Sequence, residues 1–164
     1  MGKKNNQSIS FKEKTEQYEK KITNLALRKA KEEIYITFNF SFLTNNNSYN
    51  FNCKDCTQEH KGILIERLVD LSSRSLVSLT ATTGKQQGLE KITSFGKKDK
   101  IKNMELHRKF QNSKRNELTG EEFWIFRLCP NNNPYETRII GKMIDDVFYA
   151  MFIDYNHELY AKRN

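Results

Sequence analysis

Near its C-terminal end, the chain holds side chains whose types and spacing suit proton transfer at a phosphate. His157 lies in Asp154-Tyr-Asn-His157-Glu-Leu-Tyr160, just after an apolar stretch, and Arg138 lies one predicted strand earlier. An imidazole, a phenol and a guanidinium together can take a proton, return one and hold phosphate charge. Cleavage of RNA through its ribose 2′-hydroxyl needs these three tasks. His157, Tyr160 and Arg138 are therefore candidate catalytic residues; the alternative is that His157 only completes a hydrogen-bonded turn at the strand end.

A second candidate site is the strongly basic segment 85–120. It holds ten basic and four acidic residues, and so carries +6 of the formal net charge of +8. Phe95, His107 and Phe110 are interspersed among the cations. Such a mixture suits single-stranded nucleic acid, whose phosphates pair with Lys and Arg while its bases stack on rings. The alternatives are a solvated loop and a dock for an acidic protein partner. The residues expected to bind RNA are Lys97, Lys98, Lys100, Lys102, Arg108 and Lys109.

The cysteines form a third pattern, which resembles part of a zinc site. Cys53 and Cys56 are separated by two residues, and His60 follows. Structural zinc sites usually pair such a motif with a second one, and Cys129 and His107 could complete the set only if the fold brings them close. We therefore expect no metal and no cofactor, with a zinc-stabilised interaction protein as the alternative.

Composition limits the class of protein. Hydrophobic residues make up 37% of the 164 residues and aromatic residues 12%, which argues against a disordered chain. No stretch approaches the roughly 20 apolar residues that span a bilayer, and the basic start lacks the apolar run of a secretory signal. Three cysteines then fit a reducing cytoplasm. The phosphate-loop, dinucleotide-binding, hydrolase-elbow and zincin motifs do not occur, which disfavours those enzyme classes.

The elements that must position these residues follow from hydrophobic periodicity. Residues 1–33 carry one narrow apolar stripe on a charged helix, which predicts an arm that packs on the domain edge or on a partner. Residues 34–42 alternate with a period of two and predict a strand, joined through a turn at 44–48 to a second strand at 49–53. Residues 57–71 predict a helix, and a further turn or two continues to 79.

The rest of the chain predicts a short helix within a long loop, followed by three strands. The helix is expected near residues 104–110 of the basic segment. The strands at 122–129, 136–144 and 147–154 are joined by short turns and form an antiparallel meander. The predicted fold is α+β, with a curved antiparallel sheet, helices on one face, an arm at 1–33 and a single core domain at 34–164.

The order of the predicted elements, Arg138 in Thr-Arg-Ile-Ile and the ending His157-Glu-Leu-Tyr160 resemble the RelE/ParE toxin superfamily. The segments Gly88-Leu-Glu-Lys-Ile92, Phe126-Arg127-Leu128 and Val147–Asp154 through Leu159-Tyr160 resemble a group of bacterial proteins associated with the same fold. The resemblance covers roughly residues 34–160 and implies a RelE-like fold. The helical arm at 1–33 and the long segment 96–120 depart from a minimal toxin of this kind.

The resemblance also implies an activity and partners. It implies a toxin that cleaves mRNA without a metal, often on the ribosome, and that an acidic antitoxin inhibits. Arg127 and Arg138 would then hold phosphate, His157 and Tyr160 would move protons, and Lys91 is a secondary candidate. Fold likeness alone does not transfer activity. The leading alternative is a non-catalytic module, phage-encoded or part of a phage-defence system, that binds nucleic acid or a protein.

Overall fold

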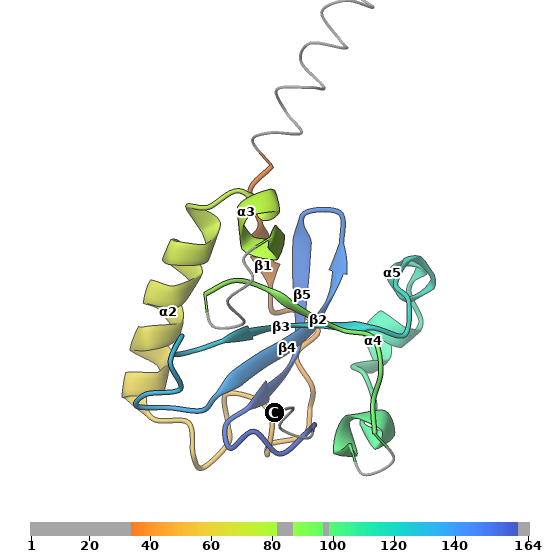
Figure 1. The fold of residues 1–164 in the computed structure, drawn as a ribbon. Helices are drawn as coiled ribbons and strands as arrows, with labels where there is room; N and C mark the ends of the chain where they lie inside the picture. Colours follow the sequence, from red (N-terminus) through yellow and green to blue (C-terminus); the bar gives the residue numbers. More distant parts are fainter. Residues whose placement is uncertain (1–33, 82–86, 97–98, 161–164) are drawn as a thin grey trace, which may run out of the picture. The chain divides into compact units, whose positions relative to one another are not determined.

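A computed structural model of the chain describes residues 34–81, 87–96 and 99–160, all within one compact unit, Ile34–Asn164. These residues form a five-stranded sheet with helical segments on both faces (Figure 1). The strands are β1 (Thr37–Asn39), β2 (Glu90–Ile92), β3 (Phe123–Arg127), β4 (Arg138–Ile144) and β5 (Val147–Asp154). The helices are α2 (Gln58–Ser72), α3 (Leu76–Ala81), the 3-10 helix η1 (Lys100–Asn103), α4 (Arg108–Gln111) and α5 (Lys114–Leu118). The predicted arm at 1–33 lies outside the described residues.

The sheet has the strand order β1-β5-β4-β3-β2 and is mostly antiparallel. The predicted meander of three strands is confirmed as β3, β4 and β5. β1 runs parallel to β5, an arrangement that the sequence did not predict. Between Ile140 and Gly141 the register of β4 with β5 shifts, because Met151 is an extra residue in β5 and forms a bulge. The mixed α and β class and the mainly antiparallel sheet are thus confirmed.

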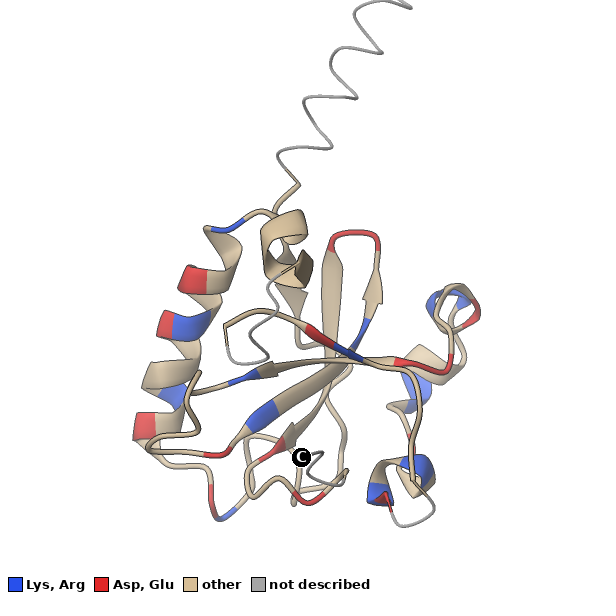
Figure 2. Cartoon of the chain, viewed as in Figure 1, with Lys and Arg blue, Asp and Glu red and all other residues tan. Residues whose placement is uncertain are grey.

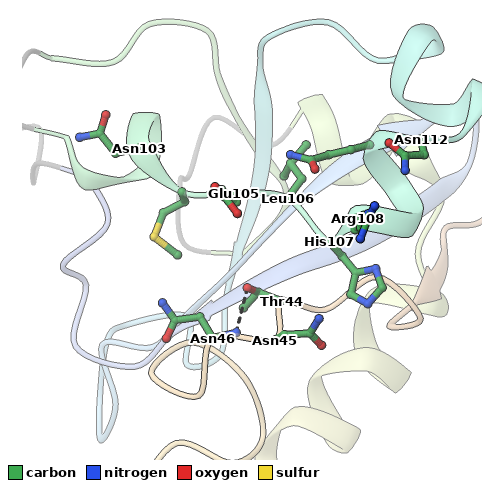
Figure 3. Close-up of a pocket in the computed structure, with 11 residues that line it drawn as sticks. Thr44, Asn45, Asn46, Asn103, Glu105, Leu106, His107, Arg108 and Asn112 are labelled. Atoms are coloured by element: carbon green, nitrogen blue, oxygen red, sulfur yellow. Dashed lines mark hydrogen bonds between the residues drawn. The ribbon is translucent and has the colours of Figure 1, made fainter.

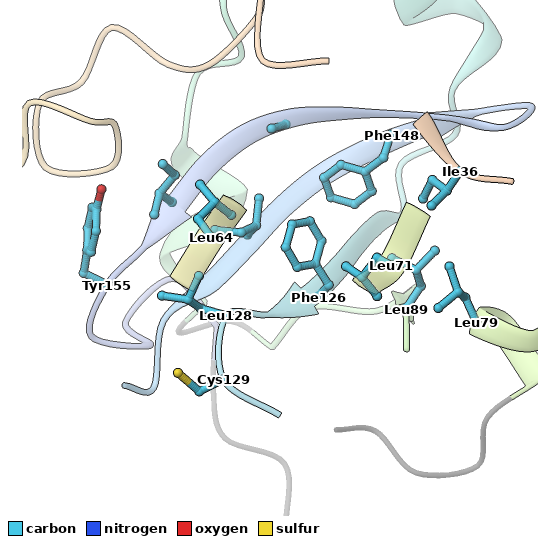
Figure 4. Packing of buried hydrophobic residues seen from close by; sticks show 13 residues of the cluster. Ile36, Leu64, Leu71, Leu79, Leu89, Phe126, Leu128, Cys129, Phe148 and Tyr155 are labelled. Atoms are coloured by element: carbon cyan, nitrogen blue, oxygen red, sulfur yellow. The ribbon is translucent and has the colours of Figure 1, made fainter. Parts of the chain in front are cut away.

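The first face of the sheet packs against α2 and α3. Leu64 and Leu71 of α2 and Leu79 of α3 meet the strand residues Phe126 and Phe148 in one apolar cluster (Figure 4). Helix α2 begins at Thr57, whose hydroxyl accepts the backbone N–H of His60 while the His60 ring bonds back to Thr57. This reciprocal cap satisfies two helix-end donors. The predicted helix at 57–71 and its short continuation are confirmed.

The second face of the sheet is covered by the basic segment, which corrects the prediction of helices on one face only. Ile101 of η1 and Phe110 of α4 pack with the strand residues Ile125, Ile140 and Phe152. Burying this much apolar surface stabilises the segment as part of the core. The predicted helix near 104–110 is observed as α4, at Arg108–Gln111. Residues 99–118 of the segment therefore form a second layer, in which Lys100, Lys102, Arg108 and Lys109 are exposed. Figure 2 shows blue segments along its helices.

The predictions for residues 34–56 are wrong in two respects. The first strand is only three residues long, and residues 49–53 form turns rather than a strand. Thr44, Asn46 and Asn50 hold this loop, because their side chains hydrogen-bond nearby backbone groups. Local bonds of this kind compete with strand pairing. The loop nevertheless follows β5, since Thr44 N–H donates to the Met151 carbonyl at 2.9 Å.

Strand β2 is a further departure, because residues 85–120 were expected to be mainly loop. Its three residues pair antiparallel with β3 and form one edge of the sheet. Lys91 lies opposite Trp124 in this pairing. The strand is too short and too charged to show an alternating pattern in the sequence. It is a strand because its backbone pairs with β3.

Candidate functional site

A row of three charged residues crosses the sheet where β3 ends, β4 begins and β5 ends. Arg127 lies opposite Arg138, and Arg138 lies opposite Asp154. All three share the second face, because the residue two positions from each along its strand belongs to the second-face core. The row thus brings two of the predicted catalytic residues, Arg127 and Arg138, into neighbouring positions.

Asp154 organises the turn that carries the other two predicted residues. Its carboxylate oxygens accept the backbone N–H groups of Glu158 and Leu159, each at 2.9 Å. This closes a tight turn in which His157 takes a left-handed backbone conformation with φ of 54°. The turn returns the chain to the sheet, where Leu159 and Tyr160 are buried in the second-face core. Burial raises the pKa of Asp154, while the two N–H groups oppose that rise.

The His157 and Tyr160 rings lie against each other. Their centroids are 4.6 Å apart and the rings meet edge to face. Burial raises the pKa of Tyr160 to about 12, while the nearby Arg138 guanidinium favours the ionised form and limits the rise. At neutral pH the phenol therefore keeps its proton and can act as a donor. The predicted grouping of His157, Tyr160, Arg138 and Arg127 is thus one contiguous set of side chains.

The two arginines differ in their access to solvent. The side chain of Arg127 is 14% exposed, and it donates to the Glu90 carboxylate and to the Asn132 amide oxygen, both at 3.2 Å. Arg138 is 2% exposed and donates to the Glu136 carbonyl at 2.6 Å. Arg127 therefore borders the surface, as does the half-buried His157. Arg138 is buried beside Tyr160, which it can orient.

Lys91 lies apart from this group. It precedes Ile92, a second-face core residue, in β2, so it points to the first face. There its ammonium pairs with Glu122 at 2.9 Å and lies 5.6 Å from the centre of the Trp124 ring. Pairing with Lys91 lowers the pKa of Glu122. The structure gives Lys91 no place beside the other predicted catalytic residues.

The predicted RNA-binding residues partly adjoin the His157 turn. Lys100 pairs with Glu158 at 2.9 Å, which raises the pKa of Lys100, and Ile101 N–H donates to the Leu159 carbonyl at 2.9 Å. Helix η1 is thereby fastened to the turn that holds His157. Lys102, Arg108 and Lys109 are exposed on η1 and α4, whereas Lys97 and Lys98 lie outside the described residues. Figure 2 shows blue segments on the layer that covers the second face.

Sequence reasoning missed three charged residues near or beside this face. Glu90 was overlooked because β2 was not predicted, and Asp154 was treated only as the end of a strand. A carboxylate at a strand end before a tight turn is the signal that could have identified Asp154. Lys142 is 4% exposed, and its ammonium donates to the Gly120 and Glu122 carbonyls at 2.7 and 2.8 Å. Burial lowers the pKa of Lys142 to about 8.

Cys53, Cys56 and His60 have structural contacts: both cysteines pack against the first-face core, and His60 takes part in the cap of helix α2. His60 is buried, its Nδ1 lies 2.7 Å from the Thr57 hydroxyl, and its ring centroid is 3.8 Å from that of Tyr135. Burial lowers the pKa of His60. Within the part of the chain that the structure describes, no group of three or more His, Cys, Asp or Glu side chains is arranged to hold a metal ion.

Comparison with known proteins found no similar protein. No family model, no curated protein and no solved structure matches this chain. The resemblance to the RelE/ParE superfamily therefore stays a hypothesis that depends on the motifs quoted above. None of the described helices has the length and apolar character needed to cross a bilayer.

The arrangement provides the parts for acid–base chemistry at a phosphate. His157 and Arg127 are partly exposed, and the buried Tyr160, in ring contact with His157, supplies a protonated phenol. An imidazole can take a proton, a phenol can return one, and a guanidinium can balance charge that develops on a phosphorane. Their fixed positions on a strand end and a capped turn favour such a role, because rigid elements hold catalytic groups more accurately than free loops.

Proposed function

We propose that this protein is a metal-independent endoribonuclease of toxin type, of a toxin–antitoxin or phage-defence system. The observation that carries the proposal is the convergence of Arg127, Arg138, His157 and Tyr160 at one end of the sheet. These residues come from three separate segments of the chain. Side chains assembled in this way supply the proton acceptor, proton donor and cation that RNA cleavage requires.

In the proposed reaction, His157 takes the proton of a ribose 2′-hydroxyl and the resulting oxygen attacks the adjacent phosphorus. The bond from phosphorus to the 5′-oxygen breaks, and Tyr160 gives that oxygen a proton. The products are a 2′,3′-cyclic phosphate and a free 5′-hydroxyl. Arg127 holds the phosphate, for which it must exchange its contact with Glu90. Arg138 is a positioning residue that keeps Tyr160 in place.

The basic residues of η1 and α4 would hold the RNA backbone beside this site. Lys100 and Lys102 lie on η1, which is bonded to the His157 turn through Ile101 and Leu159. Phosphate contacts fix the register of a nucleic acid on a protein without reading its sequence. The ribosome is a candidate setting for this RNA, and an acidic antitoxin is a candidate partner, with the arm at 1–33 as its docking segment.

The test is induced expression in a bacterial host, with growth followed and RNA 5′ ends mapped. The variant of choice is His157→Asn, because Asn accepts a left-handed backbone better than Ala does. Asn156→Ala, one residue away, is the matched control. We expect growth arrest and new 5′ ends with wild type and Asn156→Ala, and neither with His157→Asn. New 5′ ends that persist in His157→Asn, with the variant folded, would remove the assignment.

Metal independence is tested on purified protein. Full-length chain is incubated with labelled single-stranded RNA in excess EDTA, in parallel with His157→Asn purified in the same way. Cleavage by wild type alone is expected. Activity that disappears in EDTA and returns with a divalent cation would contradict the proposed reaction.

The burial of Arg138 and the pairing of Arg127 with Glu90 favour a second candidate function, a nucleic-acid-binding module without catalysis. In that case the charged row stabilises the sheet, and η1 and α4 alone contact RNA. The same experiment separates the two functions. RNA binding without new 5′ ends, unchanged by His157→Asn, would support the binding module.

A further inference from the structure

A polar hollow lies beyond η1, between the loop 44–46 and the segment 103–112. Its volume is about 630 Å³, within the range of small-molecule sites. Figure 3 shows the loop residues on one side of it and the residues of the basic segment on the other. The lining residues that matter here are Asn45, Asn46, Asn103, His107, Arg108 and Asn112.

Carboxamides dominate the lining of this hollow. Asn45, Asn103 and Asn112 are exposed, and among the described residues their side-chain amides make no hydrogen bond. The side chain of Asn46 already makes one hydrogen bond, because its amide oxygen accepts the Ser48 N–H at 3.0 Å. A carboxamide presents one acceptor beside one donor. That pair matches an edge of adenine, which carries an amino donor beside a ring-nitrogen acceptor. Cytosine carries the same pair on a smaller ring, which stacks less strongly, so the combination with a stacking surface favours adenine.

His107 and Arg108 add a stacking surface for a base and a cation for a phosphate. The Nδ1 of His107 accepts the backbone N–H of Lys109 at 3.2 Å, and its ring centroid lies 6.3 Å from that of Phe42. The imidazole is thus held beside the hollow as a surface on which a base can stack. Arg108 is exposed and supplies a cation for a phosphate.

Helix η1 connects the hollow to the proposed site. Helix η1 starts at Lys100, which pairs with Glu158 of the His157 turn, and ends at Asn103, which lines the hollow. Four residues of 3-10 helix extend about 8 Å. A single strand lying along η1 would therefore place one nucleotide at His157 and a nearby one in the hollow.

We propose that the hollow binds one unpaired adenine nucleotide of a single-stranded RNA. The inference rests on the proposed function to the extent that the ligand is RNA. The carboxamide of Asn112 reads the edge of the base, His107 stacks on it, and Arg108 contacts a phosphate, since these three residues lie toward the same end of the hollow while Asn103 lies at the other (Figure 3). The hollow would thereby set where the RNA is bound relative to His157.

Binding is measured by fluorescence anisotropy with ten-nucleotide oligomers of A, U, C or G. Full-length His157→Asn is used so that no cleavage occurs. We expect oligo-A to bind at least about five-fold more tightly than oligo-U or oligo-C, the lower limit for one good amide–base pair. Asn112→Ala should remove this preference, and Arg108→Ala should weaken all oligomers alike. Gln58→Ala, an exposed amide at the start of α2, should change neither.

The outcomes separate this inference from the proposed function. Equal binding of all four oligomers, a preference for another base, or a preference that survives in Asn112→Ala would overturn the adenine site. Cleavage by wild type could still be observed in each of those cases. An oligo-A preference that depends on the Asn112 amide, in a protein that cleaves nothing, would support the adenine site and overturn the enzyme. Failure of every oligomer to bind would overturn both.

Discussion

Arg127 and Arg138 lie directly opposite each other on β3 and β4, and both face the second layer of the fold. Opposed like charges destabilise a strand pair. Each arginine has a carboxylate on its other side, since Glu90 accepts a hydrogen bond from Arg127 and Asp154 lies opposite Arg138. With Glu90 beside it, the row of Arg127, Arg138 and Asp154 becomes a group of two cations and two carboxylates whose parts depend on one another.

The first prediction concerns the unequal contribution of the two arginines to stability. Arg138→Met should lower the free energy of unfolding by about 3 kcal/mol, because it removes the charged donor from the Glu136 and Thr137 carbonyls in a buried site. Arg127→Met should lower it by about 1 kcal/mol, because Arg127 borders the solvent. Urea unfolding followed by circular dichroism measures both values. Equal losses in the two variants would contradict the difference in burial on which the prediction depends.

A second prediction separates stability from activity at His157. The left-handed backbone of this residue, with φ of 54°, is strained by about 1 kcal/mol for a residue with a Cβ. His157→Gly should therefore be more stable than His157→Ala by about 1 kcal/mol, while both lack RNA cleavage. Thermal unfolding and a cleavage assay are the two measurements. Equal stability of the two variants would show that the turn takes another conformation in solution.

Tyr160→Phe gives a third prediction, which tests the donor role. The phenol keeps its proton at neutral pH, and burial raises its pKa further, to about 12. Removing the hydroxyl should leave the ring packed beside His157 and reduce cleavage by about 10²- to 10⁴-fold. Single-turnover rates with a defined oligomer measure the effect. A folded Tyr160→Phe with wild-type rates would exclude Tyr160 as the proton donor.

The central strands and the grouping of side chains at their ends could be predicted from the sequence. β4 and β5 are long, apolar and joined by a two-residue turn, so their pairing follows from local pattern. That pairing fixes Arg138 opposite Asp154 and brings His157 and Tyr160 to the same end. The types and spacing of His157 and Tyr160 in the motif His157-Glu-Leu-Tyr160 were the basis for grouping them with Arg138.

The parts that the sequence did not predict depend on contacts between distant residues. Glu90 joins the charged row only because a three-residue strand pairs with β3. The loop 40–56 alternates in hydrophobicity, yet side chains such as Asn50 bond to its own backbone and prevent a hairpin. The basic segment covers the second face through Ile101 and Phe110, which are single apolar residues among many charges.

The fourth prediction is a pH dependence that comes from Lys142. In the folded chain burial lowers the pKa of Lys142 to about 8, against 10.5 for an unperturbed lysine. Between these two values the unfolded chain binds more protons, so the contribution of Lys142 to the free energy of unfolding rises with pH. From pH 7 to pH 10 the rise should be about 2 kcal/mol.

Lys142→Met is the variant that tests this dependence. Wild type should gain stability relative to the variant as the pH increases, whatever the offset caused by the lost bonds to the Gly120 and Glu122 carbonyls. The ionisation of tyrosines such as Tyr160 occurs in both proteins and cancels in the difference. Urea unfolding at several pH values gives the slope. A constant difference from pH 7 to pH 10 would mean that Lys142 keeps an ordinary pKa in the folded chain.

The last prediction concerns the basic surface formed by η1. Lys102 is exposed on this helix, which is bonded to the His157 turn through Ile101 and Leu159. If Lys102 contacts one RNA phosphate, Lys102→Ala should weaken binding of all sequences alike. It should also reduce the slope of log affinity against log salt concentration by about one, because one fewer counterion is released. Lys61→Ala on α2, on the first face, is the matched control and should leave the slope unchanged. Equal slopes for wild type and Lys102→Ala would place the RNA elsewhere, and a lower slope in Lys61→Ala would show that binding depends on overall charge rather than on this surface.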